Sequence, residues 1–146
     1  MSDARLSSEN LHASSVARDG RAVLFVGPSG SGKSDLVLRM VDRGFMLVSD
    51  DRTIVSKDRD KLFASAPLTI RGKLEIRGIG IVELDSVDDV PVALVVELTS
   101  DMERMPDDSR ERLILGIHVP LISVDAMTAS AASKVALALD QFGTKF

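Results

Sequence analysis

The chain has 146 residues, of which 45% are hydrophobic and 27% are charged, which is enough to bury the core of one domain. Its formal net charge of −4, without a dense Lys/Arg run, argues against nucleic acid as a partner. It contains no cysteine, which excludes disulfides, thiolate catalysis and cysteine-based zinc sites. No apolar run is long enough to span a bilayer, so we expect residues 1–146 to form a single cytoplasmic domain that does not enter a membrane.

The first predicted element is a β-hairpin. Two runs over residues 11–18 and 21–27 flank Asp19 and Gly20, a dipeptide that suits a tight turn because both positions tolerate positive φ. The second run contains the continuous apolar segment AVLFV, which is typical of a strand buried on both faces. A glycine-rich segment and then a helical pattern follow directly. One face of that helix carries Leu36, Val37, Met40 and Val41, and Gly44 lies at the position of a C-terminal cap.

The rest of the chain reads mainly as strands. Strand patterns cover residues 45–49, 53–56, 62–65, 74–84, 91–98 and 118–124. Residues 99–112 are polar and contain Pro106, which predicts a loop. A final helix is predicted from about residue 127 to 141, with Met127, Ala131, Val135 and Leu139 in register and Gly143 at its end.

Residues 27–34 match the phosphate-loop pattern G-x-x-x-x-G-K-[ST]. The matching residues are Gly27, Pro28, Ser29, Gly30, Ser31, Gly32, Lys33 and Ser34. Glycines allow successive backbone N–H groups to point at phosphate oxygens, and the start of the following helix adds partial positive charge. In such a loop Lys33 can reach the β- and γ-phosphates, and the Ser34 hydroxyl can bind Mg²⁺. Because a predicted strand precedes the motif and a predicted helix follows it, we expect ATP and Mg²⁺ to bind here.

Two adjacent carboxylates, Asp50 and Asp51, follow the apolar strand at residues 45–49. Neighbouring strand residues point to opposite sides, so one aspartate could face the metal and the γ-phosphate while the other supports it or meets the attacking hydroxyl. The alternative is a solvated acidic turn. The phosphate loop upstream favours the catalytic interpretation of both residues.

Other candidates are less specific. Glu75 and Arg77 are two residues apart on a predicted strand and would share a face, as a metal-binding carboxylate and a phosphate-facing arginine or as an exposed ion pair. His12 lies inside the first strand of the predicted hairpin, where a packing or surface histidine is common. Arg104 in the polar loop could reach a phosphoryl group, whereas His118 is expected to be structural.

Together, GPSGSGKSDLVLRMVDRGFMLVSDD and LEIRGIGIV resemble the catalytic domain of the bacterial HPr kinase/phosphorylase family. The resemblance implies an ATP-dependent kinase that phosphorylates a serine of the phosphocarrier HPr and can reverse the reaction with inorganic phosphate. It assigns His12, Lys33 and Asp51 to catalysis, with Asp51 taking the serine proton, and Ser34 and Glu75 to Mg²⁺. Arg104 is a looser match. Family members are usually hexameric.

The resemblance implies an α/β P-loop fold of the HPr kinase and PEP carboxykinase type, a mixed β-sheet with flanking helices. The sequence resembles the short form of the family, expected without a separate N-terminal domain, and its residues 124–128 stand where the family has a Pro-Gly-Arg loop linked to dephosphorylation. Two other functions remain open. One is a non-catalytic nucleotide sensor, and the other is a kinase with a small-molecule acceptor, as in the PEP carboxykinases.

Overall fold

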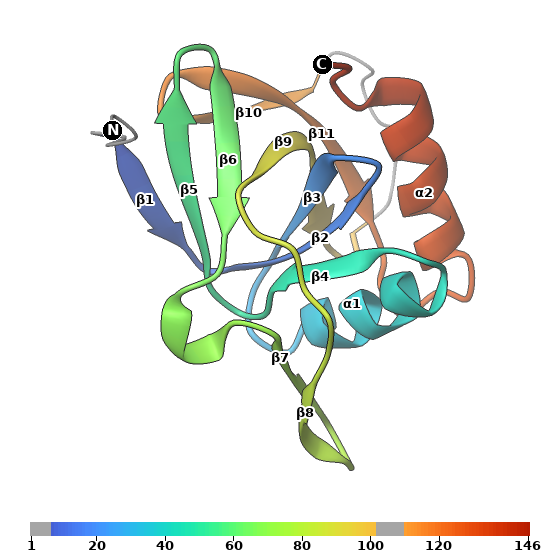
Figure 1. Ribbon diagram of the computed structural model, residues 1–146. Coiled ribbons are helices and arrows are strands. Elements are labelled where there is room, and N and C mark those ends of the chain that lie inside the picture. Colours follow the sequence, from blue (N-terminus) through green and yellow to red (C-terminus); the bar gives the residue numbers. More distant parts are fainter. Residues whose placement is uncertain (1–6, 102–109) are drawn as a thin grey trace.

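The computed structural model describes residues 7–101 and 110–146 (Figure 1). Its strands are β1 Ser8–Leu11, β2 Ala13–Arg18, β3 Arg21–Val26, β4 Met46–Ser49, β5 Thr53–Asp58, β6 Lys61–Ser65, β7 Lys73–Ile76, β8 Gly80–Glu83, β9 Val90–Leu98, β10 Glu111–Ile114 and β11 Ile117–Val124. The helices are α1 Lys33–Asp42, α2 Ala131–Phe142 and the short 3-10 helix η1 Leu68–Ile70. No helix within the described residues is long and apolar enough to cross a membrane.

A curled mixed sheet forms the centre of the molecule. Its strands follow the order β1-β5-β6-β9-β3-β2-β4, and β11 pairs with both β9 and β10. The pairs β3–β9 and β9–β11 are parallel, and the other strand pairs are antiparallel. The carboxyl ends of β3, β9 and β11 therefore meet at one edge, where ligands of α/β proteins commonly bind.

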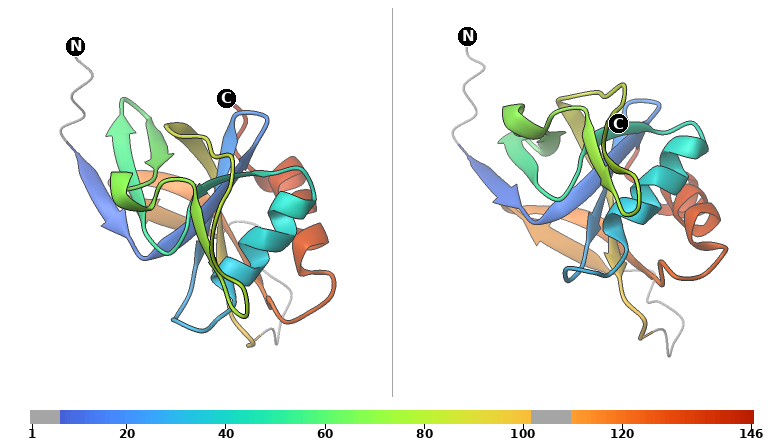
Figure 2. Two further views of the ribbon diagram at one scale, coloured as in Figure 1. Left: turned by 60° about the horizontal axis from the view of Figure 1, so that its bottom comes forward. Right: turned by 90° about the horizontal axis from the view of Figure 1, so that it is seen from below.

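Hydrophobic side chains fill both sides of this sheet. One cluster joins α1 and α2 to β3 and β9 through residues such as Phe25, Leu36 and Leu139, all fully buried. The second cluster lies on the opposite side and joins β3 and β9 to β5, β6 and β11. Seen from below, the two helices lie side by side on one face of the sheet (Figure 2). The sheet thus separates two apolar layers.

The first half of the chain follows the sequence patterns closely. β2 and β3 form the predicted antiparallel hairpin, with Arg18 opposite Arg21 and Asp19 and Gly20 at φ 54° and 75°. α1 buries the predicted apolar face, and Gly44 follows it at φ 95°. The strands predicted at residues 45–49, 53–56 and 62–65 are also present, as β4, β5 and β6.

Three predictions about the later elements were wrong. Residues 74–84 form the hairpin β7–β8 rather than one strand, because Gly78 and Gly80 adopt φ 89° and 106° at the turn. Residues 111 and 112, the end of the predicted loop, belong instead to β10, which pairs with β11. The last helix begins at Ala131, because the Asp125 carboxylate accepts the Met127 N–H at 2.9 Å and holds a turn there. Met127 is consequently 74% exposed instead of packed in the core.

Candidate functional site

The loop between β3 and α1 surrounds a set of backbone N–H groups. Gly30 and Gly32 adopt φ 82° and 97°, the left-handed region that turns successive N–H groups toward one side. Gly32 is the N-cap of α1, and no side chain in the described part of the chain caps this end of the helix. The first N–H groups of α1 therefore remain available to an anion, and the helix dipole favours one. The strand, loop and helix follow one another as the sequence predicts.

The Lys33 side chain lies along the inside of this loop. Its Nζ donates hydrogen bonds to the Gly27 and Pro28 carbonyl oxygens at 2.7 and 3.0 Å. The residue is only 6% exposed, and burial lowers the pKa of Lys33 below its usual 10.5, although the charges of Asp51 and Asp50 act in the opposite direction. A buried ammonium held by two neutral carbonyls would gain stronger partners from phosphate oxygens.

Asp50 connects three parts of the chain. Its Oδ1 accepts hydrogen bonds from the Ser34 hydroxyl at 2.6 Å and from the Ser14 hydroxyl at 3.2 Å. Its Oδ2 accepts the Glu75 N–H at 3.2 Å, which brings β7 to the same carboxylate. Asp50 is 8% exposed, so nearly all its interactions are with protein groups. This side of the site therefore combines a hydroxyl and a carboxylate, both oxygen ligands.

Asp51 points to a different neighbour. Its Oδ1 lies 2.9 Å from His12 Nε2, and the two side chains are 62% and 53% exposed. The expectation that the aspartates alternate along a strand was wrong, because β4 ends at Ser49 and Asp51 has φ 69°. The expectation that His12 lies inside a strand was also wrong, because it occupies a bend between β1 and β2. The two aspartates still face different partners, one buried and one open to solvent.

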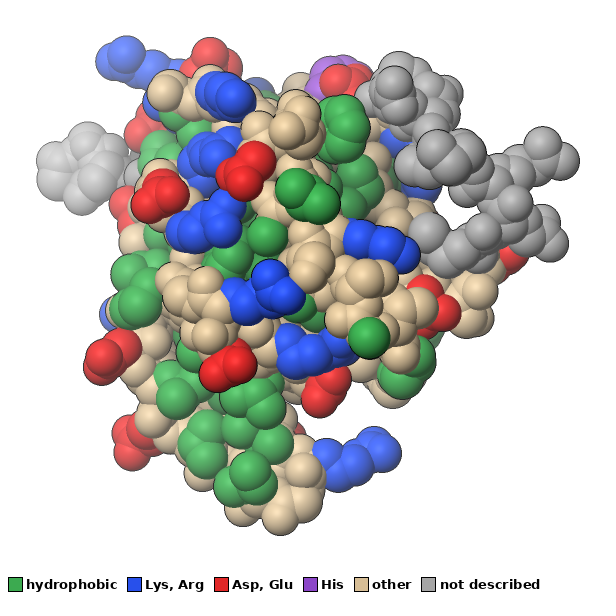
Figure 3. All heavy atoms as spheres, turned by 90° about the vertical axis from the view of Figure 1, so that its right-hand side faces the viewer, with side chains coloured by type: hydrophobic (Ala, Val, Ile, Leu, Met, Phe, Trp, Pro, Cys, Tyr) green, Lys and Arg blue, Asp and Glu red, His purple; other side chains and the backbone are tan. Residues whose placement is uncertain are grey.

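Glu75 and Arg77 do not share the face of one strand as predicted. Glu75 is in β7, with its backbone at Asp50 and its side chain exposed, whereas β7 ends at Ile76 and Arg77 lies in the turn of the hairpin. Figure 3 shows hydrophobic side chains gathered toward the lower end of the molecule, where this hairpin projects. Arg104 lies outside the described residues. Glu75 is thus close to the site through its backbone, and Arg77 is at the hairpin tip.

The chain is similar in sequence to known proteins over most of its length. The sequence model of the HPr Serine kinase C-terminal domain matches residues 4–139. The chain belongs to this family. The HPr kinase/phosphorylase of Prosthecochloris aestuarii is 36% identical over 129 residues, which cover 80% of this chain and 38% of that protein. The HPr kinase/phosphorylase of Latilactobacillus sakei is 34% identical over 128 residues, covering 79% of this chain and 41% of that protein. The chain thus spans about two fifths of these relatives' length.

A solved structure extends the comparison to the fold. The Hpr(Ser) kinase/phosphatase of Coxiella burnetii superposes with a TM-score of 0.79 and 29% sequence identity, covering 90% of this chain and 94% of that one. The mixed sheet with flanking helices that the sequence predicts is therefore the fold of an HPr serine kinase C-terminal domain.

The oxygen atoms at Ser34 and Asp50 fit Mg²⁺. Mg²⁺ prefers hard oxygen ligands and is commonly held by one or two carboxylates together with substrate phosphates. Within residues 7–101 and 110–146, no group of three or more His, Asp and Glu side chains is arranged to hold a metal ion. The hydroxyl and carboxylate 2.6 Å apart at the start of α1 are where a cation accompanying nucleotide phosphates would bind.

Sequence reasoning did not find Ser14. Its side chain is fully buried in β2, where its hydroxyl donates to Asp50 and accepts the Asp51 N–H at 2.9 Å. The sequence gives little indication of this role, because a serine in an apolar strand usually serves only in packing. Only the antiparallel pairing of β2 with β4 brings this hydroxyl to the aspartates.

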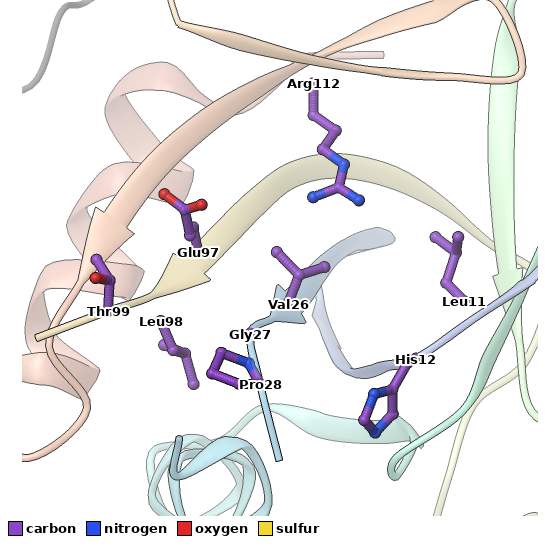
Figure 4. A pocket seen from close by; sticks show the side chains of 9 residues that line it. All are labelled: Leu11, His12, Val26, Gly27, Pro28, Glu97, Leu98, Thr99 and Arg112. Atoms are coloured by element: carbon purple, nitrogen blue, oxygen red, sulfur yellow. The ribbon is translucent and has the colours of Figure 1, made fainter. Parts of the chain in front are cut away.

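A pocket also lies beside the loop, and sequence reasoning did not predict it. Its volume is about 400 Å³, and it lies at the carboxyl ends of β3 and β9 (Figure 4). The lining residues are Leu11, His12, Val26, Gly27, Pro28, Glu97, Leu98, Thr99 and Arg112. The pocket therefore connects the start of the phosphate loop with His12, with the end of β9 and with Arg112 on β10.

Proposed function

We propose that this domain is a serine kinase that transfers the γ-phosphoryl group of ATP to HPr. The observation that carries the proposal is that the two adjacent aspartates, Asp50 and Asp51, have different partners. Asp50 accepts the Ser34 hydroxyl beside the phosphate loop, and Asp51 lies exposed against His12. One carboxylate thus has the position of a metal ligand and the other that of a general base, at the mouth of one anion-binding loop. Membership of the family and the names of the relatives support HPr as the acceptor.

In the proposed reaction the loop N–H groups and Lys33 bind the nucleotide phosphates, and Lys33 exchanges its carbonyl partners for phosphate oxygens. Mg²⁺, when bound, supplies charge neutralisation on the phosphates, with Ser34, Asp50 and Glu75 as the residues that would hold it. Asp51 accepts the proton of the HPr serine hydroxyl as the serine oxygen bonds to the γ-phosphorus and the bond to the β-phosphate oxygen breaks, releasing ADP. His12 keeps the Asp51 carboxylate oriented from 2.9 Å.

A phosphotransfer assay with labelled ATP and purified HPr tests this proposal. Asp51→Asn should keep nucleotide affinity but slow transfer by about 10²- to 10⁴-fold, because it removes the general base. Asp60→Asn, at the exposed turn between β5 and β6, serves as the control and should transfer at the normal rate. Lys33→Ala should no longer transfer label from ATP to HPr. Robust labelling of HPr by that variant would disprove the role of the loop.

The same assay separates the two alternatives and the reverse reaction. Nucleotide binding without phosphoserine formation on HPr would favour a sensor, and transfer to a small molecule would favour the other kinase. Running the assay with phosphorylated HPr and inorganic phosphate tests the reverse reaction. Here residues 125–128 form a turn, and Arg39 of α1 donates a hydrogen bond to the Thr128 carbonyl oxygen at 3.3 Å.

A further inference from the structure

The pocket beside the phosphate loop contains one cation that the mechanism above does not use. Arg112 is on β10, and its guanidinium points into the pocket from the side opposite Gly27 and Pro28 (Figure 4). It shares one face of β10 with Ile114, which is 5% exposed and belongs to the hydrophobic core. The register that buries Ile114 therefore also places Arg112, which is exposed, on the face of β10 toward the pocket.

The other charged groups of the pocket already have partners. Glu97 Oε1 accepts hydrogen bonds from Arg110 Nη2 and from the Ser123 hydroxyl, both at 3.1 Å, and Arg110 Nη1 donates to Ser123 at 2.8 Å. His12 is paired with Asp51. Arg112 has no hydrogen-bond or ion-pair partner among residues 7–101 and 110–146. Among the described residues that line the pocket, Arg112 is thus the cationic side chain without a partner.

The proposed reaction creates an anion at this place. When a serine accepts a phosphoryl group near Asp51, the product carries about two negative charges. The loop N–H groups and Lys33 face the donor side of that group, and the exposed Asp51 carboxylate on the acceptor side would repel it. An arginine matches phosphate oxygens with two parallel N–H donors, which a point charge cannot do.

We propose that Arg112 binds the phosphoryl group of phosphoserine on the acceptor side of the site. This inference rests on the proposed function, since it requires a serine acceptor. A free phosphate ion offers the same chemistry, but the pocket is much larger than such an ion and has apolar walls formed by Leu11, Val26 and Leu98. Those walls suit the protein segment that carries the phosphoserine. Arg112 acts as a specificity-determining residue for the phosphorylated acceptor.

Binding measurements on Arg112→Gln and Arg112→Lys test the proposal. The ligands are phosphoserine HPr, unphosphorylated HPr, inorganic phosphate alone and a non-hydrolysable ATP analogue. Arg112→Gln should bind phosphoserine HPr about tenfold or more weakly, the effect expected for losing charged hydrogen bonds, with little change for the other three ligands. Arg112→Lys keeps the charge without the paired donors and should show a smaller loss. Arg59→Gln, in the turn between β5 and β6, is the matched control and should behave as the unchanged protein.

Unchanged affinity of Arg112→Gln for phosphoserine HPr would overturn the proposal, as would failure of the unchanged protein to prefer phosphoserine HPr over HPr. An equal loss of inorganic phosphate binding would assign the site to the free ion and also overturn it. If Arg112→Gln loses the ATP analogue through misfolding, Arg112→Lys decides, because a variant with normal nucleotide affinity must still bind phosphoserine HPr more weakly. Absence of nucleotide affinity in the unchanged protein contradicts the proposed function separately.

Discussion

At the scale of single residues, the hydroxyl of Ser14 links the two aspartates. It donates to Asp50 Oδ1 at 3.2 Å and accepts the Asp51 N–H at 2.9 Å. Asp51 has φ 69°, a conformation that non-glycine residues rarely adopt, so its backbone needs such a partner to hold it in place. The direction of the exposed Asp51 carboxylate therefore depends on a buried side chain that does not itself face the ligand.

We predict that Ser14→Ala slows phosphoryl transfer by about ten- to a hundredfold, because a misplaced base is costly even when it is present. Unfolding free energy should fall by about 1–3 kcal/mol, since the Asp51 N–H loses its partner. Ser14→Thr keeps the hydroxyl and should restore the rate. Ser15→Ala is the control, because its equally buried hydroxyl bonds Thr53 Oγ1 at 2.9 Å and not an aspartate. Ser15→Ala should lower the free energy of unfolding without slowing phosphoryl transfer. Equal transfer rates for Ser14→Ala and Ser15→Ala would refute the role of Ser14.

Lys33 predicts a pH dependence of nucleotide affinity. The ammonium form binds phosphate, so affinity is full below the pKa of Lys33 and falls as the pH rises through it. Burial lowers this pKa from 10.5, and the fall should therefore begin at a lower pH than for an ordinary lysine. Lys33→Arg stays charged throughout this range and should bind with little pH dependence. Titration of a fluorescent ATP analogue from neutral to alkaline pH measures both curves, and parallel curves would contradict the prediction.

At the scale of elements, the sequence predicts those helices, strands and turns that are determined by residues adjacent in the chain. The Asp19-Gly20 turn, the strand AVLFV and α1 follow from residues adjacent in sequence, and all three are present. The break between β7 and β8 could not be predicted from alternation, because two positive-φ glycines interrupt a pattern that otherwise continues. β10 forms only because β11 pairs with it, and the polar residues 111 and 112 give no strand signal.

The site shows the same limit. The phosphate loop is a contiguous motif and was found from the sequence, as were the tandem aspartates that follow a strand. Contacts across the sheet were not found. Ser14 meets Asp50 across 36 positions, and Arg112 reaches the pocket only through the pairing of β10, β11 and β9. Neither relation leaves a trace in residue spacing.

The loop also depends on the bare backbone of Gly27, and this yields a prediction. A Cβ at Gly27 would lie 2.9 Å from Ser31 Oγ and 3.1 Å from the Leu98 carbonyl oxygen, and the backbone has φ 155°. Gly27→Ala should destabilise the fold by about 1–3 kcal/mol and weaken nucleotide binding, because the loop must shift away from β9.

Comparison with Gly20→Ala separates the steric cost of an added Cβ from the cost of placing alanine at positive φ. Gly20 has φ 75° but nothing within 4 Å of a Cβ, and it lies at the hairpin turn away from the loop. Its variant should lose about 1–2 kcal/mol from left-handed strain alone and bind nucleotide normally. Thermal unfolding and nucleotide titration of both variants give the comparison, and normal nucleotide affinity in Gly27→Ala would refute the argument.

At the scale of the whole molecule, the sheet is a shared wall between two apolar layers. β3 and β9 contribute residues to both: Phe25 packs with the helices, and the adjacent Leu24 packs with β5 and β6. Both central strands are covered on two faces, and the phosphate loop and the pocket both begin at their carboxyl ends, where ligands of α/β proteins commonly bind.

This arrangement predicts that neighbouring residues of β3 are equally important for stability although they face opposite ways. Leu24 and Phe25 are both fully buried, so Leu24→Ala should cost about 2–5 kcal/mol and Phe25→Ala about 3–5 kcal/mol of unfolding free energy. Leu137→Ala, at a 61% exposed position of α2, should change it by less than about 0.5 kcal/mol. Denaturant unfolding measures all three. A one-sided sheet would leave one of the two β3 variants near the control, and such a result would show that the second layer contributes little to holding the loop in place.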